Sequence, residues 1–128
     1  MSKTKECTPE IKVGRLTKAT QFLADCALIE SNIDDNEMAD AFITLCVHAG
    51  IAASDVICCS KLNVHSYGAN HNNAVGLLAR IDLTSSIHLK TLLDMKGHSG
   101  YSAVPSTPEY RANAKIAAEA LVQAAQLA

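Results

Sequence analysis

Aromatic residues are scarce in this chain of 128 residues, where they make up 4% of the sequence and tryptophan is absent. Sandwiches of β-strands draw on aromatic and β-branched side chains, so this scarcity argues against an all-β core. Alanine, leucine and isoleucine dominate instead, and hydrophobic residues amount to 48% of the chain. The composition therefore predicts close-packed helices, and the length suits one domain with a real hydrophobic core.

A strong charge of either sign is also lacking, because the formal net charge is −2. The chain therefore has no general attraction for nucleic acids or membrane phosphates, and any binding of a polyanion must be local. It carries no DNA groove-binding motif. Five of the eleven lysines and arginines precede residue 20. We interpret residues 1–12 as a flexible, solvated N-terminal arm and residues 13–128 as one helical bundle.

Signals of export, membrane insertion and metal binding are missing as well. The first residues, MSKTKECTPEIKVG, are polar, and we find no apolar run approaching the roughly 20 residues of a membrane span, so we expect a soluble, cytoplasmic protein. The cysteines form no Cys-x-x-Cys pair and lie mostly in apolar helical patterns, which predicts reduced, buried thiols and neither a zinc site nor a cofactor. They are Cys7, Cys26, Cys46, Cys58 and Cys59.

Apolar residues recur at helical spacing in four long stretches. The first helix is predicted over 13–31, and the second from a cap among Asp34, Asp35 and Asn36 to about residue 62. The second has small residues in its middle and apolar residues on almost every face. We therefore expect other helices, and a second copy of the chain, to cover more than one side of it.

The segment NVHSYGANHNN has no periodicity and predicts a loop, with the asparagines of 70–73 capping a short helix that ends near residue 81. A fourth helix is predicted from about residue 85 until Gly97 and Gly100 interrupt it. Thr107 followed by Pro108 is typical of a helix start, so the last helix is expected to run from there to the C-terminus. The predicted fold class is all-α.

Two polar residues, His48 and Asp55, interrupt the apolar second helix. They are seven residues apart, so they share one stripe of the helix but lie roughly 10 Å from each other and cannot touch. One interpretation is structural: a buried imidazole bonded to a neighbouring element, and a carboxylate that needs a partner because an unpaired buried charge is costly. The candidate partners for Asp55 are His71, Lys96 and Tyr101.

Three segments in this order resemble the HEPN superfamily of helical domains. They are CVHAGIAASDVICCSKLNV, GANHNNAVGLLARI and LLDMKGHSGYSAVPSTPEYRANAKIAAEALVQAA. The resemblance covers most of residues 13–127. It implies an up-and-down four-helix bundle with one additional short helix, which commonly dimerises and is often found in toxin–antitoxin, nucleotide-binding or phage-defence contexts.

The active ribonucleases of that superfamily carry an arginine followed, after four to six intervening residues, by a histidine. None of the three arginines here meets this spacing, since His88 lies one residue too far from Arg80. The corresponding segment here resembles Lys96 to Tyr101, in which Lys96 and His98 offer a compressed substitute that Gly97 and Gly100 make loose. RNA cleavage requires a proton-transfer group and a cation held in fixed relation, so we expect a non-catalytic protein.

A polar cluster is the predicted ligand-binding site. A loop histidine and a cation or phenol from the fourth helix would converge on the second helix, giving a nucleotide pocket in which Lys96 meets phosphate. The same cluster would alternatively lock the loop, and a metal site from its histidines and aspartate has no supporting spacing. The five residues are His48, Asp55, His71, Lys96 and Tyr101.

The sequence thus predicts a homodimeric, non-catalytic HEPN-like module that binds a nucleotide, an RNA or a protein partner. The first alternative is a diverged, metal-independent ribonuclease that relies on Lys96, His98 and Tyr101. The second is a structural or antitoxin-like interaction module.

Overall fold

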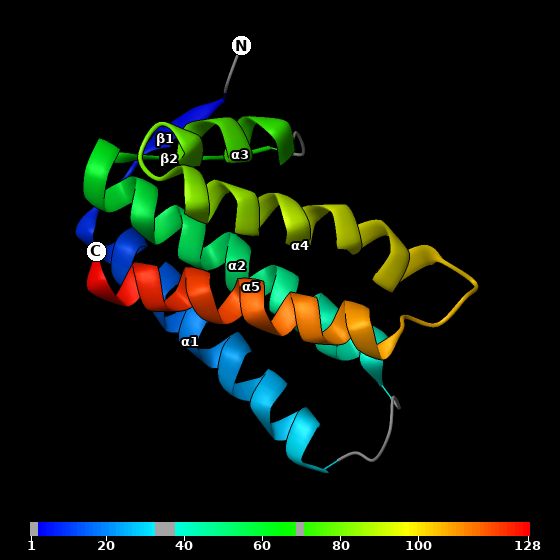
Figure 1. Ribbon diagram of the computed structural model, residues 1–128. Helices are drawn as coiled ribbons and strands as arrows, with labels where there is room; N and C mark the ends of the chain where they lie inside the picture. The colour runs from blue at the N-terminus through cyan, green and yellow to red at the C-terminus, as the bar shows by residue number, and fades with distance from the viewer. Residues whose placement is uncertain (1–2, 33–37, 69–70) are drawn as a thin grey trace.

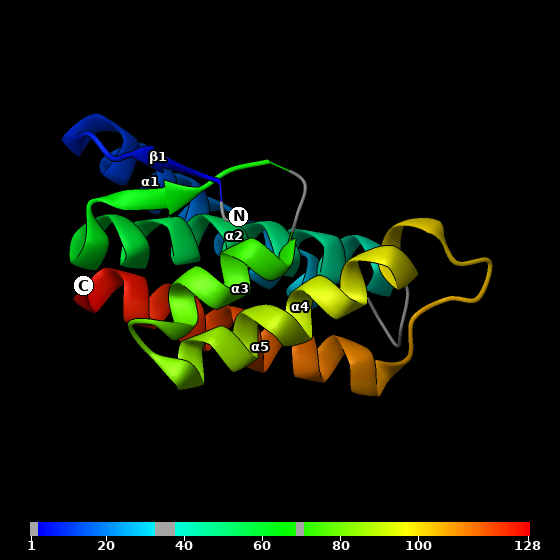
Figure 2. The same cartoon turned by 90° about the horizontal axis from the view of Figure 1, so that it is seen from above.

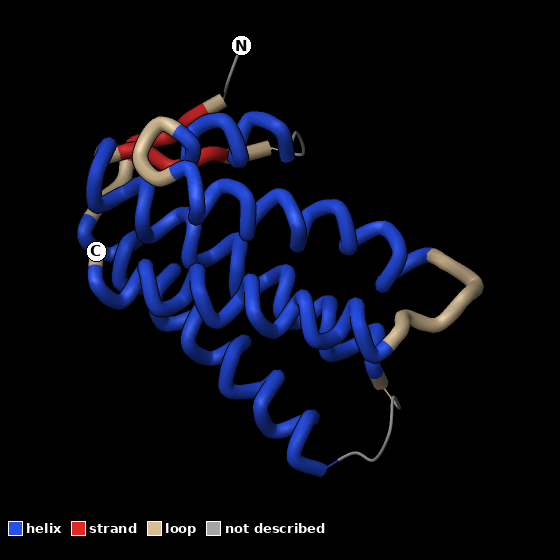
Figure 3. Tube along the Cα trace, in the orientation of Figure 1, coloured by secondary structure: helices blue, strands red, loops and turns tan. Residues whose placement is uncertain are grey.

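The structure is a computed structural model that describes residues 3–32, 38–68 and 71–128, with only the backbone of residue 71. Within these ranges the chain is almost entirely helical, which confirms the predicted all-α class, and two three-residue strands form a small sheet (Figures 1 and 3). The elements are β1 (Thr4–Glu6), α1 (Pro9–Asn32), α2 (Ala39–Leu62), β2 (Val64–Ser66), α3 (His71–Ala79), α4 (Leu83–Tyr101) and α5 (Pro108–Leu127).

Helix α2 is the central element of the fold. It packs against α1, α4 and α5, and β2 and α3 cover its C-terminal part. Fourteen of its 24 residues are buried, which confirms that protein covers more than one side of it. Figure 2 shows α2 running beneath the two strands and between α1 and α3.

The expectation that no segment approaches a membrane span is wrong for α2. Among the described residues it alone is long and apolar enough to cross a membrane, judged by length and composition. However, 72% of its most apolar window is buried inside the protein. A helix packed on several sides is apolar all round, so the core of a globular protein passes the same test.

Small residues in the middle of α2 allow its neighbours to approach closely. At Gly50, an added Cβ would lie 2.4 Å from Cδ1 of Leu92 in α4 and 3.2 Å from Cδ1 of Leu121 in α5. Both leucines are fully buried, so neither has free space to move into. Gly50 therefore sets the distance at which α4 and α5 pack on α2.

Part of the N-terminal segment, which the sequence predicts as a flexible arm, pairs with another segment of the chain. Residues 4–6 pair antiparallel with residues 64–66 of the predicted loop, with Lys5 opposite His65. Asn63 has a φ of 58° and turns the chain from α2 into β2, and its carbonyl oxygen accepts a hydrogen bond from the N–H of Cys7 (2.9 Å). A disulfide joins Cys7 to Cys59, so the prediction of five reduced cysteines is wrong for this pair.

The bounds of two helices differ from those predicted. Helix α1 begins at Pro9 rather than residue 13, because Thr8 Oγ1 accepts a hydrogen bond from the N–H of Ile11 (3.2 Å) and caps the helix. Helix α4 continues through both of its glycines to residue 101, so the predicted interruption is wrong. Its packing on α2 and α5 offsets the roughly 1 kcal/mol that each glycine costs a helix interior.

Two other helices, α4 and α5, begin directly after a residue whose side chain caps them. Thr107 Oγ1 accepts a hydrogen bond from the N–H of Tyr110, which confirms the predicted start of α5 at Pro108. Asp82 caps α4 by accepting hydrogen bonds from the N–H groups of Thr84 and Ser85. The predicted caps at Asp34, Asp35, Asn36 and Asn70 lie outside the described residues.

We expect reduction of the Cys7–Cys59 disulfide to lower the free energy of unfolding by about 4 kcal/mol. The bond spans 52 residues, and breaking it restores conformational freedom to the unfolded chain. Urea unfolding with and without dithiothreitol measures the difference. A Cys7→Ser variant serves as the control, because it should start at the lower stability and not respond to dithiothreitol. Equal midpoints for the oxidised and reduced wild type would contradict the prediction.

Candidate functional site

The polar stripe of α2 faces the edge of α1. Arg15 Nε donates a hydrogen bond to Asp55 Oδ2 at 2.9 Å, and the ring of Phe22 lies 5.5 Å from the ring of His48. The second contact lies seven residues later in α1 and seven residues earlier in α2 than the first, as expected for antiparallel helices. His48 is exposed, so the structural prediction of a buried imidazole is wrong.

Asp55 has a partner that the sequence analysis did not propose. Its carboxylate is 15% exposed and pairs with Arg15, which is 30% exposed, whereas the predicted candidates were His71, Lys96 and Tyr101. Burial raises the pKa of Asp55, while the charges of Arg15 and His65 and the hydrogen bond from Arg15 act to lower it. Burial is the larger effect, so ionised Asp55 depends on these positive neighbours.

Asp55 and Lys96 line one cleft, which we call the Asp55–Lys96 cleft. It has a volume of about 240 Å³ and lies where α2, β2, α3 and α4 meet. Ser54 and Ser66 add hydroxyl groups to its wall, and the backbone of Gly68 (φ 93°) adds a segment without a side chain. The remaining lining is apolar and consists of Ile51, Ala74, Leu89 and Leu93.

Two of the other predicted site residues, His48 and Tyr101, lie away from this cleft. His48 lies two turns before Asp55 on α2 and does not line the cleft. Tyr101 ends α4 and is 88% exposed. The backbone of His71 begins α3, but its side chain lies outside the described residues. Of the four predicted residues whose side chains the structure describes, it therefore brings two together, Asp55 and Lys96.

The compressed pair of Lys96 and His98 is separated by the geometry of α4. Residues two apart on a helix differ by about 200° in direction. Lys96 accordingly lines the cleft beside α2, whereas the ring of His98 lies 5.3 Å from that of Tyr110 in α5. The two side chains therefore do not converge on one substrate position.

Sequence reasoning missed Arg15, Ser54 and Ser66. The sequence prediction places Arg15 in the first helix and gives it no role. Arg15 and Phe22 are seven residues apart in the sequence, as are His48 and Asp55. This shared spacing was the available signal. No sequence pattern marked Ser66, because its segment was predicted to be a loop rather than a strand paired with the N-terminus.

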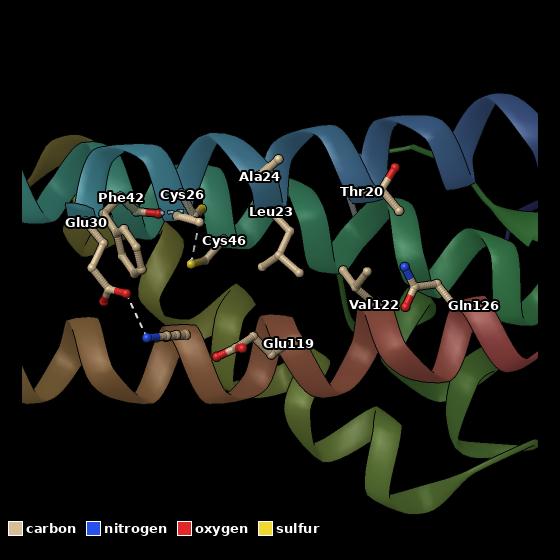
Figure 4. Close-up of a pocket in the computed structure, with 12 residues that line it drawn as sticks. Thr20, Leu23, Ala24, Cys26, Glu30, Phe42, Cys46, Glu119, Val122 and Gln126 are labelled. Carbon is tan, nitrogen blue, oxygen red and sulfur yellow. Dashed lines mark hydrogen bonds and ion pairs between the residues drawn. The ribbon is translucent and has the colours of Figure 1, made fainter. Parts of the chain in front are cut away.

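A second cavity lies between α1 and α5, with α2 as its floor, and we call it the α1–α5 groove (Figure 4). Its volume is about 450 Å³. In Figure 4, Leu23 of α1 and Val122 of α5 lie between the two helices, with Glu30 toward one end, Thr20 and Gln126 toward the other, and Glu119 between them. In the part of the chain that the structure describes, no group of three histidine, cysteine or acidic side chains is placed to bind a metal.

Comparison with known proteins adds no assignment. No protein-family model matches the chain, and no curated protein matches it.

We expect Arg15→Met to lower the free energy of unfolding by about 2 kcal/mol at pH 7, since it leaves a largely buried carboxylate without its partner. Because the pKa of Asp55 is raised in the folded protein, its ionisation costs stability as the pH rises above its ordinary value of 3.8. The loss in Arg15→Met should therefore be much smaller at about pH 3.5, where the carboxyl is protonated. Urea unfolding at both pH values measures it.

Two variants make this measurement specific. Asp55→Asn does not titrate, so its free energy of unfolding relative to the wild type should rise as the pH increases above about 4. Lys90→Met removes an exposed ion pair with Asp94 and should change stability by less than about 0.5 kcal/mol. A loss in Arg15→Met that is the same at both pH values would contradict the assigned role of the pair.

Proposed function

We propose that this chain is a HEPN-like, non-catalytic module that binds a phosphate-bearing ligand, a nucleotide or an RNA end, in the Asp55–Lys96 cleft. The observation that carries the proposal is that Lys96, Ser54 and Ser66 line one cleft. Ammonium and hydroxyl groups are donors that phosphate oxygens accept. Lys96 supplies a point charge, as lysines do in many phosphate sites.

The charge around the cleft favours an anion. Arg15 and Asp55 form a pair, and the positive field of Arg15 and His65 reaches Asp55. Because Arg15 neutralises Asp55, this carboxylate does little to repel an anion beside Lys96 on the opposite wall. An anion that enters the cleft meets the charge of Lys96 in a half-buried setting, where screening by water is weaker than at the open surface.

The size of the cleft limits what it can hold. At about 240 Å³ it is smaller than the roughly 300–1,000 Å³ typical of sites that enclose a drug-sized ligand. It suits the phosphate and sugar of a nucleotide, with the base lying against the surface outside. That arrangement would accept a free nucleotide or the terminal nucleotide of an RNA.

The separation of Lys96 from His98 favours binding over the ribonuclease alternative. Metal-independent cleavage needs a base near the 2′-hydroxyl and a cation near the same phosphate. With His98 against Tyr110, a phosphate bound by Lys96 has no imidazole from α4 beside it. The proposed function is therefore to bind the phosphate group without cleaving the RNA.

We expect Lys96→Gln to raise the Kd for a fluorescent nucleotide or a 5′-phosphorylated RNA about tenfold, the effect of losing about 1.4 kcal/mol of charge-assisted bonding. Fluorescence anisotropy at a fixed salt concentration measures it. Lys90→Gln on the same helix is the matched control and should bind like the wild type. Binding that is unchanged in Lys96→Gln would overturn the assignment to the cleft, and cleavage of the RNA would favour the ribonuclease alternative.

We also propose that the protein is a homodimer. Large apolar side chains remain more than half exposed on three helices, and Leu83 and Ile87 of α4 lie four residues apart on one side of that helix. Covering such a pair is favourable, because apolar surface leaves water.

Light scattering should give twice the chain mass of 13.6 kDa. A Leu83→Lys, Ile87→Lys double variant should shift the protein toward the monomer, while Val13→Lys on α1 should not. A wild-type protein that stays at the chain mass at all concentrations would rule out the dimer.

A further inference from the structure

The α1–α5 groove combines an apolar floor with a charged end. Leu23, Phe42, Cys46 and Val122 contribute apolar surface between the two helices. The volume of about 450 Å³ lies within the range of small-molecule sites. In Figure 1 the second half of α1 diverges from α5, and Glu30 lies in this half of α1.

The floor of the groove stays uncharged at neutral pH. Cys26 Sγ lies 3.5 Å from Cys46 Sγ, and Cys26 is also placed to donate to the carbonyl oxygen of Phe42. The hydrogen bond with Cys26, burial and the charges of Glu119 and Glu30 all raise the pKa of Cys46. The Cys46 thiol is therefore protonated, and it acts as a small apolar group against a ligand.

The charged end of the groove has an excess of carboxylate. Lys115 Nζ pairs with Glu30 Oε1 at 2.7 Å, which neutralises one of the two acids. Glu119 lies one helical turn after Lys115 and raises its pKa, but in the described residues we find no hydrogen bond or ion pair formed by Glu119. Arg111, which also acts on Lys115, is eight residues and about 12 Å along α5 from Glu119, and it does not line the groove.

We propose that the α1–α5 groove binds a small organic cation, an amine with an apolar body of about six to ten carbon atoms. The apolar body would cover Leu23, Phe42 and Val122. The ammonium group would pair with Glu119 beside the Glu30–Lys115 pair. This site is separate from the Asp55–Lys96 cleft, which lies where α2, β2, α3 and α4 meet and selects the opposite charge.

The test compares three probes of equal chain length: hexylammonium, hexanoate and hexanol. Titration calorimetry with the full chain should give binding for hexylammonium and at least tenfold weaker binding for the other two. Hexanoate meets the charge of Glu119, and hexanol lacks the ammonium group. Equal binding of the three probes would overturn the proposal, because the groove would then select apolar surface alone. Absence of hexylammonium binding would overturn it as well.

Variants locate the site. Glu119→Gln should weaken hexylammonium binding at least tenfold, whereas Glu109→Gln, an exposed acid in the first turn of the same helix, should bind like the wild type. Ala24→Phe places a ring in the groove from an exposed position of α1 and should abolish binding without disturbing the core. Lys96→Gln should leave it unchanged. Binding that survives both Glu119→Gln and Ala24→Phe would place the cation elsewhere and contradict the proposal.

Discussion

The burial of α2 is the constraint on which the rest of the structure depends. Its alanines and Gly50 let α4 and α5 approach to side-chain contact, and α1 lies along another side. A helix enclosed in this way satisfies its backbone internally and gains from apolar burial on most of its surface. Its few polar side chains can then lie only where other elements leave α2 uncovered. These places are the two cavities that α2 lines and the edge of α1.

Charge is divided between the two sides of the molecule. The Asp55–Lys96 cleft has one lysine and one carboxylate at its walls, and that carboxylate pairs with Arg15, whereas the α1–α5 groove has two carboxylates and one lysine. The net charge of −2 conceals this division, because opposite local excesses cancel in a sum. A nearly neutral chain can therefore present surfaces that attract ligands of opposite sign.

Periodicity and capping chemistry predicted most of the helices. The combination of Thr107 and Pro108 located the start of α5, and the same combination at Thr8 and Pro9 marks the start of α1, where the prediction overlooked it. The predicted interruption of α4 was wrong because it considered only the low helix propensity of glycine. The packing of α4 on its neighbours outweighs that cost here. The pairing of β1 with β2 depends on contacts between residues about sixty apart, and no local pattern encodes such contacts.

Only part of the candidate site could be predicted from the sequence, because the partners of its residues depend on how the helices pack. The need of Asp55 for a partner followed from the cost of burying a charge, but the identity of that partner depended on how α1 lies against α2. Lys96 reached the predicted cleft because a helical lysine can span the gap between elements. For His48, the apolar neighbours in sequence suggested burial, whereas the side chain is exposed and lies beside Phe22 at the edge of α1.

The disulfide between Cys7 and Cys59 gives the chain an unusual covalent connectivity. It closes residues 7–59 into a ring that contains all of α1 and most of α2, while α3, α4 and α5 form a linear tail. A single backbone cut inside the ring opens it without separating the pieces, whereas a cut in the tail releases a fragment. The two helices that form the floor and one wall of the α1–α5 groove are therefore held together even in a nicked molecule, for as long as the sulfur–sulfur bond persists.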